Sequence, residues 1–390
     1  MFKDMENRSA VATLIAVQFV CAINWYSVSS VFSLIAADFH QNVSGLGLVT
    51  ATFVLGVAAF QLPAGLFAAK YGPRRALLLG TLLISSSSIL IGLADQVVFL
   101  TILRFVEGVG EGFIFGPGVI LIMRYFKKGS EGLGIGLFGG AFDLGGIVGI
   151  SGWAILGELV GWRASVVTGG VLALGAFAML VVLVPKDPSV GSLSIRFSEL
   201  KGIILNKWLL IVSAGLIVSQ VAFGINSYFM VYYLEESLKT GVYIAGAIGG
   251  LTLVASIVVA PIVGRAFDRS PSPKMTLIVL CFAAAGGLAI AAVNSVYAAL
   301  ISGLVVGVAT GGAYVFGVGI GRAIGGSRKE YEALGISWIN GIALFGGVVM
   351  PLVFSVLAAG FGYPLAWVLA GAFLVLVTLP LFALRAEAGT

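Results

Sequence analysis

The sequence predicts an all-α integral membrane protein of twelve transmembrane helices, arranged as two pseudo-symmetric six-helix bundles. Of its 390 residues, 59% are hydrophobic and only 10% are charged, whereas a soluble domain carries about 25% charged residues. Twelve apolar runs are long enough to cross a bilayer, and the two halves of the chain share a sequence pattern. A chain of this composition could not cover a water-exposed surface, so the bilayer is its expected solvent.

The apolar runs define the expected spans, because a helix needs about 20 apolar residues to cross the hydrocarbon core. They are Val11–Ala36, Gly45–Ala69, Ala76–Leu93, Val97–Met123, Leu133–Leu156, Ser165–Leu183, Leu209–Leu234, Val242–Val263, Met275–Val293, Tyr297–Ile320, Ile336–Ala359 and Pro364–Leu384. We interpret the first run as an uncleaved span and not as a secretory signal. The polar interval 185–208 is expected to be a cytoplasmic linker between an N-terminal bundle (1–184) and a C-terminal bundle (209–390).

The basic residues predict the orientation. If both termini are cytoplasmic, only Arg163 and Lys239 of the 22 Lys and Arg residues lie in outer loops, and Arg104 lies within a span. The other nineteen then lie on the cytoplasmic side, as the positive-inside rule requires. We therefore expect a multi-pass protein of the cytoplasmic membrane with both termini in the cytoplasm. These topology signals account for the net charge of +5, and no nucleic-acid partner is expected.

Sequence signals for cofactor chemistry are weak. The two cysteines, Cys21 and Cys281, lie in apolar runs, and the single histidine, His40, has no ligand partner near it in the sequence. The Gly-x-Gly-x-x-Gly pattern at 134–139 lies inside a predicted membrane helix, where helix packing explains it better than dinucleotide binding. No zinc-protease, nucleophile-elbow or Walker motif is found. The chain is therefore expected to be no enzyme and to need no cofactor or metal.

An internal repeat relates the two halves. The fifth run begins Glu131-Gly-Leu-Gly-Ile and the eleventh begins Glu332-Ala-Leu-Gly-Ile, at an offset of 201 residues. The first and seventh runs share three polar residues at an offset of 202: Gln18 with Gln220, Asn24 with Asn226, and Tyr26 with Tyr228. Parallel repeats of six spans are expected to be related by an axis along the membrane normal.

Three segments carry a resemblance to a known family. The loop after the second run reads Gly65-Leu-Phe-Ala-Ala-Lys70-Tyr-Gly72-Pro-Arg74-Arg75, and the loop after the eighth reads Gly264-Arg-Ala-Phe-Asp268-Arg269. Both resemble the signature loop of the major facilitator superfamily, although Ala69 replaces the acidic residue in the first copy. The segment from Arg104 to Gly112 is similar to the fourth-helix motif of that family. The resemblance implies a secondary transporter that works by alternating access, and we expect a monomer.

The same resemblance implies that the two loops form an inner gate. Its expected residues are Gly65, Lys70, Gly72, Arg74, Arg75, Gly264, Asp268 and Arg269. The alternative is that the basic residues among them serve topology alone.

Four ionisable residues fall inside predicted spans, where a charge costs about 2.5–3.5 kcal/mol on the insertion scale. Arg104, Glu107 and Glu111 are spaced i, i+3 and i+7 and so share one helix face, and Asp143 lies near the middle of the fifth run. Our hypothesis is that Asp143 or Glu111 exchanges a proton while Arg104 pairs with an acid or with substrate. The alternative is a static buried ion pair that fixes helix orientation.

Polar and aromatic residues in the spans are the candidates for the substrate cavity. They are Gln18, Asn24, Trp25, Tyr26, Gln220, Asn226, Tyr228, Tyr314, Trp338 and Asn340. Hydrogen bonding between helices is the alternative role for each of them.

The sequence favours a proton-coupled symporter for a small organic anion such as a monocarboxylate. The fourth run and the segment Arg124-Tyr-Phe-Lys-Lys128 look like the organic-anion and monocarboxylate branches of the family, and one buried arginine can hold a carboxylate. The expected partners are a small-molecule substrate, protons and the lipid bilayer. Two alternatives stay open: a proton-driven multidrug efflux antiporter and a non-transporting membrane receptor or scaffold.

Overall fold

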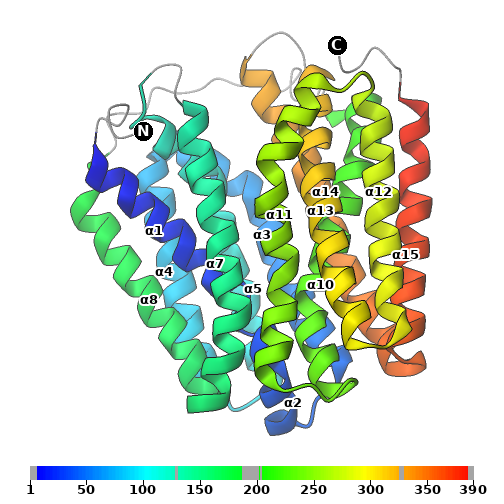
Figure 1. The fold of residues 1–390 in the computed structure, drawn as a ribbon. Helices are drawn as coiled ribbons and strands as arrows, with labels where there is room; N and C mark the ends of the chain where they lie inside the picture. The colour runs from blue at the N-terminus through cyan, green and yellow to red at the C-terminus, as the bar shows by residue number, and fades with distance from the viewer. Residues whose placement is uncertain (1–6, 128–130, 187–201, 203, 325–328, 385–390) are drawn as a thin grey trace. The chain divides into compact units, whose positions relative to one another are not determined.

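A computed structural model describes residues 7–127, 131–186, 202, 204–324 and 329–384. Within these ranges it leaves undescribed the side chains at 62, 69, 131–133, 135, 260–261, 264–269, 322–323 and 329–337. Contacts divide the chain into two compact units (Figure 1), Met1–Gln41 with Leu48–Leu193 and Asn42–Gly47 with Ser194–Thr390. The described residues form helices and no strand, so the all-α prediction is confirmed.

The first unit contains eight α-helices and one short 3₁₀ helix among the described residues. They are α1 (Arg8–Trp25), η2 (Ser29–Val31), α2 (Phe32–Phe39), α3 (Val43–Tyr71, whose first residues group with the other unit), α4 (Pro73–Gly92), α5 (Val97–Gly112), α6 (Phe115–Met123), α7 (Glu131–Val160) and α8 (Trp162–Leu183).

The described part of the second unit contains six long helices and two short 3₁₀ helices. They are α10 (Lys207–Glu236), α11 (Val242–Arg269), α12 (Pro273–Ile290), η3 (Ala291–Val293), α13 (Val296–Ile324), α14 (Lys329–Phe361), α15 (Tyr363–Thr378) and η4 (Leu379–Ala383).

Eleven helical stretches in the described part of the chain are long and apolar enough to cross a membrane. Each corresponds to one of the predicted runs. The remaining predicted run, Val97–Met123, is occupied by α5 and α6, which are 16 and 9 residues long. The layout of twelve spans is therefore retained, although the α-helix is interrupted in the middle of two of the predicted runs.

The first departure is in the run Val11–Ala36, where α1 ends at Trp25. The chain then turns through bonds from Ser27 N to Asn24 O and from Ser30 N to Tyr26 O. The Ser29 hydroxyl also donates to the carbonyl of Tyr26 at 3.2 Å. Serine side chains that bond to nearby backbone groups compete with the helical pattern, which explains a break that apolar periodicity did not reveal.

The second departure is the end of α5 at Gly112. Three glycines lie in its last turns, at 108, 110 and 112, and glycine has a lower helix propensity than every residue except proline. The backbone tightens there into bonds from Phe113 N to Gly110 O and from Ile114 N to Glu111 O. Both breaks therefore lie close in sequence to polar residues that the sequence had singled out.

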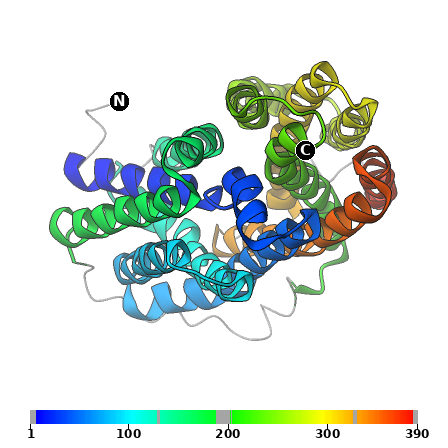
Figure 2. The ribbon, with the colours of Figure 1, turned by 90° about the horizontal axis from the view of Figure 1, so that it is seen from below.

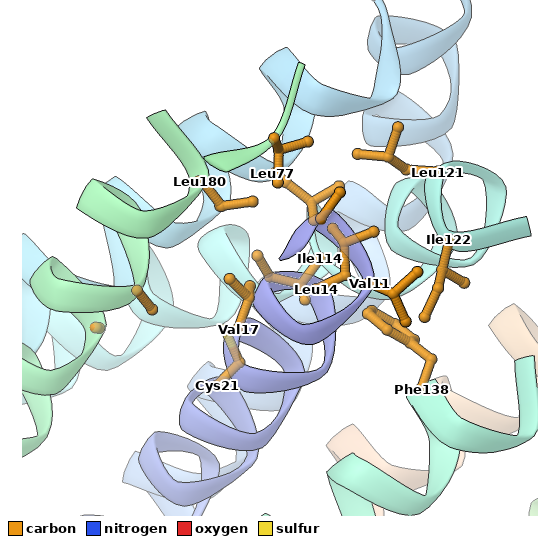
Figure 3. Close-up of a cluster of buried hydrophobic side chains, with 14 of the residues drawn as sticks. Val11, Leu14, Val17, Cys21, Leu77, Ile114, Leu121, Ile122, Phe138 and Leu180 are labelled. Atoms are coloured by element: carbon orange, nitrogen blue, oxygen red, sulfur yellow. The ribbon is translucent and has the colours of Figure 1, made fainter. Parts of the chain in front are cut away.

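Helix α1 packs beside α7 and α8 in the first unit (Figure 2). It approaches α7 closely because Gly145 and Gly149 present only backbone to it. A Cβ atom added at Gly149 would lie 2.9 Å from the carbonyl oxygen of Ile23. Along the helix, Leu14 and Val17 join an apolar cluster with Leu77 of α4, shown in Figure 3. These contacts hold α1 in a fixed place within the unit.

Two turns of the repeat are alike in backbone conformation. Gly161 joins α7 to α8 with φ 83°, and Gly362 joins α14 to α15 with φ 83°. The two glycines are 201 residues apart, which is the offset of the surrounding repeat. A side chain is disfavoured in this region of φ, so glycine is required at both turns.

A basic cap is also repeated. Arg74, next to the helix-starting Pro73 of α4, donates from Nε to the carbonyl of Val184 at 2.7 Å and from Nη2 to that of Val181 at 2.9 Å. Lys274, next to the helix-starting Pro273 of α12, donates to the carbonyls of Phe382 and Leu384 at 2.7 and 2.6 Å. The last carbonyls of a helix have no partner within it and carry a partial negative charge. Each cation therefore ties α4 to α8 or α12 to the end of the last span.

Candidate substrate and proton site

A buried ion pair forms the centre of the candidate site. Arg104 Nη1 donates to Glu107 Oε2 at 2.7 Å, one helical turn along α5. The two side chains are only 2% and 0% exposed. Buried charges of this kind persist when they are paired and hydrogen-bonded. The structure therefore brings together the arginine and the first acid of the face that the sequence predicted.

The break in α1 gives Arg104 its second partner. Nη2 donates to the carbonyl oxygen of Trp25 at 3.1 Å, and Trp25 is the last residue of α1. A helix C-terminus offers both an unbonded carbonyl and a partial negative charge, so a guanidinium is stabilised there. The end of α1 at Trp25 thus gives the Arg104 side chain of α5 a hydrogen-bond acceptor on α1.

One aromatic ring stacks on the same guanidinium, and two further rings pack in sequence behind it. Arg104 Cζ lies 4.0 Å from the ring centroid of Phe53 on α3. The Trp25 ring meets Phe53 edge-on at 4.9 Å and Phe142 of α7 at 5.4 Å. Arg104 Nε has no hydrogen-bond partner among the described residues. One N–H of a stacked, desolvated guanidinium is therefore left for another acceptor.

Ser88 extends the network to two further helices. Its Oγ lies 2.9 Å from Glu107 Oε1 and 3.1 Å from Asn24 Oδ1. Asn24 Nδ2 donates to the carbonyls of Val20 at 2.9 Å and Gly169 at 3.1 Å. We call Asn24, Ser88, Arg104 and Glu107 the buried polar network; it joins α1, α4 and α5 and reaches α8 through Gly169.

The other two acids of the prediction are less engaged. Glu111 lies at the end of α5, is 4% exposed, and its Oε1 has no partner in the described chain. Asp143 on α7 is half-buried, with no hydrogen bond or ion pair to any described residue. Each acid could accept a proton or a partner without breaking an existing contact.

The second unit contains a neutral network at the repeat-related asparagine. Asn226 Nδ2 donates to Ser302 Oγ at 3.1 Å, and Thr252 Oγ1 donates to Asn226 Oδ1 at 2.7 Å. Both asparagines are 0% exposed and bonded inside their own unit. Gln220 makes a long 3.5 Å contact to Asn340. The repeated asparagines therefore join helices in both units, and among the described residues only Asn24 is linked to a charged residue, through Ser88 to Glu107.

The remaining cavity candidates lie in less defined settings. Gln18 is 2% exposed and its Oε1 has no partner among the described residues. Tyr26 and Tyr228 are buried at 0% and 7% exposure. Tyr314 and Trp338 are half-buried. Contact with a substrate stays a prediction for all ten candidates.

The predicted gate residues separate into three groups. Arg74 is 9% exposed and caps α8, while Lys70 and Arg75 are exposed. Gly72 adopts φ 97° just before α4, and Gly65 has open space beside its Cα. Gly264, Asp268 and Arg269 belong to α11, but their surroundings and the side chains of Asp268 and Arg269 lie outside what the structure describes. Gating stays a prediction for all eight.

Sequence reasoning missed the neutral residues that hold the site together: Phe53 and Ser88 in the first unit, and Thr252 and Ser302 in the second. A signal existed for Ser88, because residues 85–88 are four consecutive serines within an apolar helix. Serine in such helices commonly bonds across to a neighbouring helix. Phe53 carried no such signal, because one phenylalanine in an apolar run is uninformative.

The two helical units and the internal charged network define the class of the protein, a polytopic membrane transporter. A model of the Major Facilitator Superfamily matches residues 14–325. The chain belongs to this superfamily, and the resemblance of its loop motifs is thereby confirmed.

Two relatives and one solved structure support this assignment. The chain is 26% identical to the gallate transporter of Pseudomonas putida over 373 residues, covering 86% of this chain and 82% of that protein. It is 29% identical to the probable sulfoacetate transporter SauU of Cupriavidus necator over 169 residues, which is 43% of this chain and only 39% of SauU. A bacterial homologue of the human lysosomal transporter Spinster has the same fold, with a TM-score of 0.76, 17% identity, and coverage of 97% and 96% of the two chains.

Proposed function

We propose that this chain is a secondary active transporter for a small organic anion, which it moves by alternating access. The observation that carries the proposal is Arg104, a guanidinium 2% exposed that has one N–H without a partner among the described residues and an aromatic ring 4.0 Å away. A guanidinium matches the geometry of carboxylate and sulfonate oxygens and also stacks on aromatic faces. The similar proteins named for gallate and sulfoacetate transport support an anionic substrate.

The balance of buried charge supports a proposed coupling to protons. Arg104 can neutralise one carboxylate, and Glu107 already occupies it at 2.7 Å. An anion that bound beside Arg104 would add a negative charge next to Glu107 and Glu111, beyond the one charge that Arg104 can neutralise. Unpaired buried charge is strongly unfavourable. Uptake of one proton by an acid of the site balances that charge, which favours symport of the anion with a proton. Asp143 is the other candidate carrier, because its carboxyl has no partner among the described residues.

The proposed setting is the cytoplasmic membrane, with both termini in the cytoplasm and the monomer as the working unit. The distribution of basic residues supports this orientation. In that orientation α5 runs inward, so Arg104 lies nearer the outer side than Glu111 does.

Flux measurements test the proposal. Purified protein in proteoliposomes is offered gallate, sulfoacetate, a neutral sugar and a lipophilic cation, with and without an inward proton gradient. We expect gradient-stimulated uptake of an organic anion, and its loss in Arg104→Gln. Transport of the lipophilic cation alone would instead support the efflux alternative, and absence of flux for every compound would contradict the proposal.

The Asp143→Asn variant locates the coupling site. If Asp143 carries the proton, the variant exchanges anion across the bilayer but no longer accumulates it against a gradient. Unchanged gradient-driven uptake in this variant would exclude Asp143 and leave Glu107 and Glu111 as the carriers.

A further inference from the structure

The hydroxyl of Ser88 lies between two acceptors but has only one proton to give. Its Oγ is 2.9 Å from Glu107 Oε1 and 3.1 Å from Asn24 Oδ1. The amide of Asn24 is oriented without ambiguity, because its Nδ2 donates to two backbone carbonyls, those of Val20 and Gly169. The oxygen of Asn24 therefore faces Ser88 and can only accept.

The protonation of Glu107 decides how this conflict is resolved. When Glu107 is ionised, both of its oxygens are acceptors, so Ser88 donates to the charged oxygen and leaves Asn24 Oδ1 without that bond. When a proton from solvent binds Glu107 Oε1, the new O–H donates to Ser88 Oγ. The hydroxyl proton of Ser88 then turns to Asn24 Oδ1. No covalent bond other than the O–H of Glu107 is formed or broken.

We propose that Ser88 is a positioning residue that reports the protonation of Glu107 to α1 and α8. Asn24 lies one residue before the end of α1, and its amide also holds the backbone of α8 at Gly169. Donation from Ser88 to Asn24 strengthens this three-helix contact only in the protonated state. The inference rests on the proposed anion and proton symport, for which it supplies a link between proton binding and helix packing.

Few charged groups lie on the helices that carry Glu107, Ser88 and Asn24. On α5, Arg104 pairs with Glu107, and Glu111 lies one turn further on. Helices α1, α4 and α8 carry charged residues only in their first turns, and α1 contributes the buried thiol of Cys21 on its inner face. Asp143 is the nearest acid to the middle of α7. The response of the network is therefore set mainly by Glu107, Arg104 and Glu111.

The structure offers a matched control one turn earlier on α4. Ser85 is 1% exposed, as buried as Ser88, and its Oγ donates to the carbonyl of Gly170 on α8 at 2.8 Å. It therefore also joins α4 to a neighbouring helix by a buried hydrogen bond, in this case α8 and with no acid involved. Ser85→Ala measures the purely structural effect of removing a buried serine hydroxyl from this helix.

The test has two parts: infrared spectra follow the titration of Glu107 in the purified protein, and flux measurements follow transport. Infrared difference spectra of the purified protein record protonated carboxyl groups as pH is varied, and the band lost in Glu107→Gln belongs to that residue. Protonation of Glu107 gives Asn24 Oδ1 the donor from Ser88, so in the wild type the amide carbonyl band of Asn24, which is the band lost in Asn24→Ala, should shift at the pH at which the Glu107 band appears. In Ser88→Ala we expect that Asn24 shift to be absent while the Glu107 band still titrates. Ser85→Ala should keep the two bands coupled as in the wild type.

Flux then separates this inference from the proposed function. If an organic anion is transported, Ser88→Ala should change the pH profile of uptake and Ser85→Ala should leave it as in the wild type. A pH-dependent shift of the Asn24 band that persists in Ser88→Ala, or that is lost equally in Ser85→Ala, would overturn the role of Ser88 whether or not any substrate is transported. Absence of flux beside the expected infrared shift would instead count against the proposed function alone.

Discussion

The buried ion pair permits a double-mutant cycle that tests whether charge balance governs the first unit. In Arg104→Met, Glu107 loses its cation and the carbonyl of Trp25 loses its donor, at contacts of 2.7 and 3.1 Å. Removal of one partner from a buried pair costs about 3–5 kcal/mol, because the remaining charge is uncompensated. Replacement of both partners by apolar residues is often nearly neutral. We therefore expect Arg104→Met to lose about 3–5 kcal/mol and Arg104→Met with Glu107→Met to recover most of it.

Two intrinsic reporters make this measurable. Cys21 and Cys281 are the only cysteines, and both are buried at 0% exposure, one in each unit. A thiol-reactive fluorophore therefore reports unfolding of either unit, and a Cys281→Ser background isolates the first. Equal destabilisation in the single and double variants would refute the charge-balance argument, because it would show that packing and the Trp25 bond account for the whole effect.

Three further substitutions have defined expectations. Arg74→Ala should destabilise the first unit by about 2–3 kcal/mol, because it removes charge-assisted bonds to the carbonyls of Val184 and Val181. The same fluorophore assay checks this. A smaller effect than that of Lys274→Ala, at a more exposed residue, would contradict it. Gly161→Ala should cost about 1–2 kcal/mol, because φ is 83° there; an unchanged unfolding midpoint would disprove the strain. Asp38→Asn breaks an ion pair to Arg163 whose side chains are 41% and 44% exposed, so stability should change by less than about 1 kcal/mol and the change should vanish in high salt.

The internal repeat predicted the similarity of the two halves but not the different lengths of their first helices. Shared composition and the matched Gln, Asn and Tyr positions predicted two similar halves, and both asparagines are indeed fully buried between helices. The repeat did not predict that α1 stops at Trp25 whereas α10 continues through Ser227 to Glu236. That difference depends on local competition from serine hydroxyls and on the partner that Arg104 provides for a freed carbonyl.

The candidate site was predicted in part for a related reason. An ionisable residue in an apolar run is conspicuous, so the sequence singled out Arg104, Glu107, Glu111 and Asp143 as candidates. The partners of a buried charge are often neutral, and their roles depend on distances across helices that a linear pattern does not contain. Ser88 lies 19 residues from Glu107 in the chain but 2.9 Å from it in space.

Arg74 and Lys274, the two basic caps, have one role during membrane insertion and another in the folded protein. In the proposed orientation, Arg74 and Lys274 first act in short cytoplasmic loops, where positive charge holds a nascent segment on that side of the membrane. Once the helices pack, the same cations are bound to carbonyls at helix ends. In that orientation these two residues contribute less free positive charge to the cytoplasmic face than the sequence suggests, and a change of either one affects both insertion and the folded helix pair.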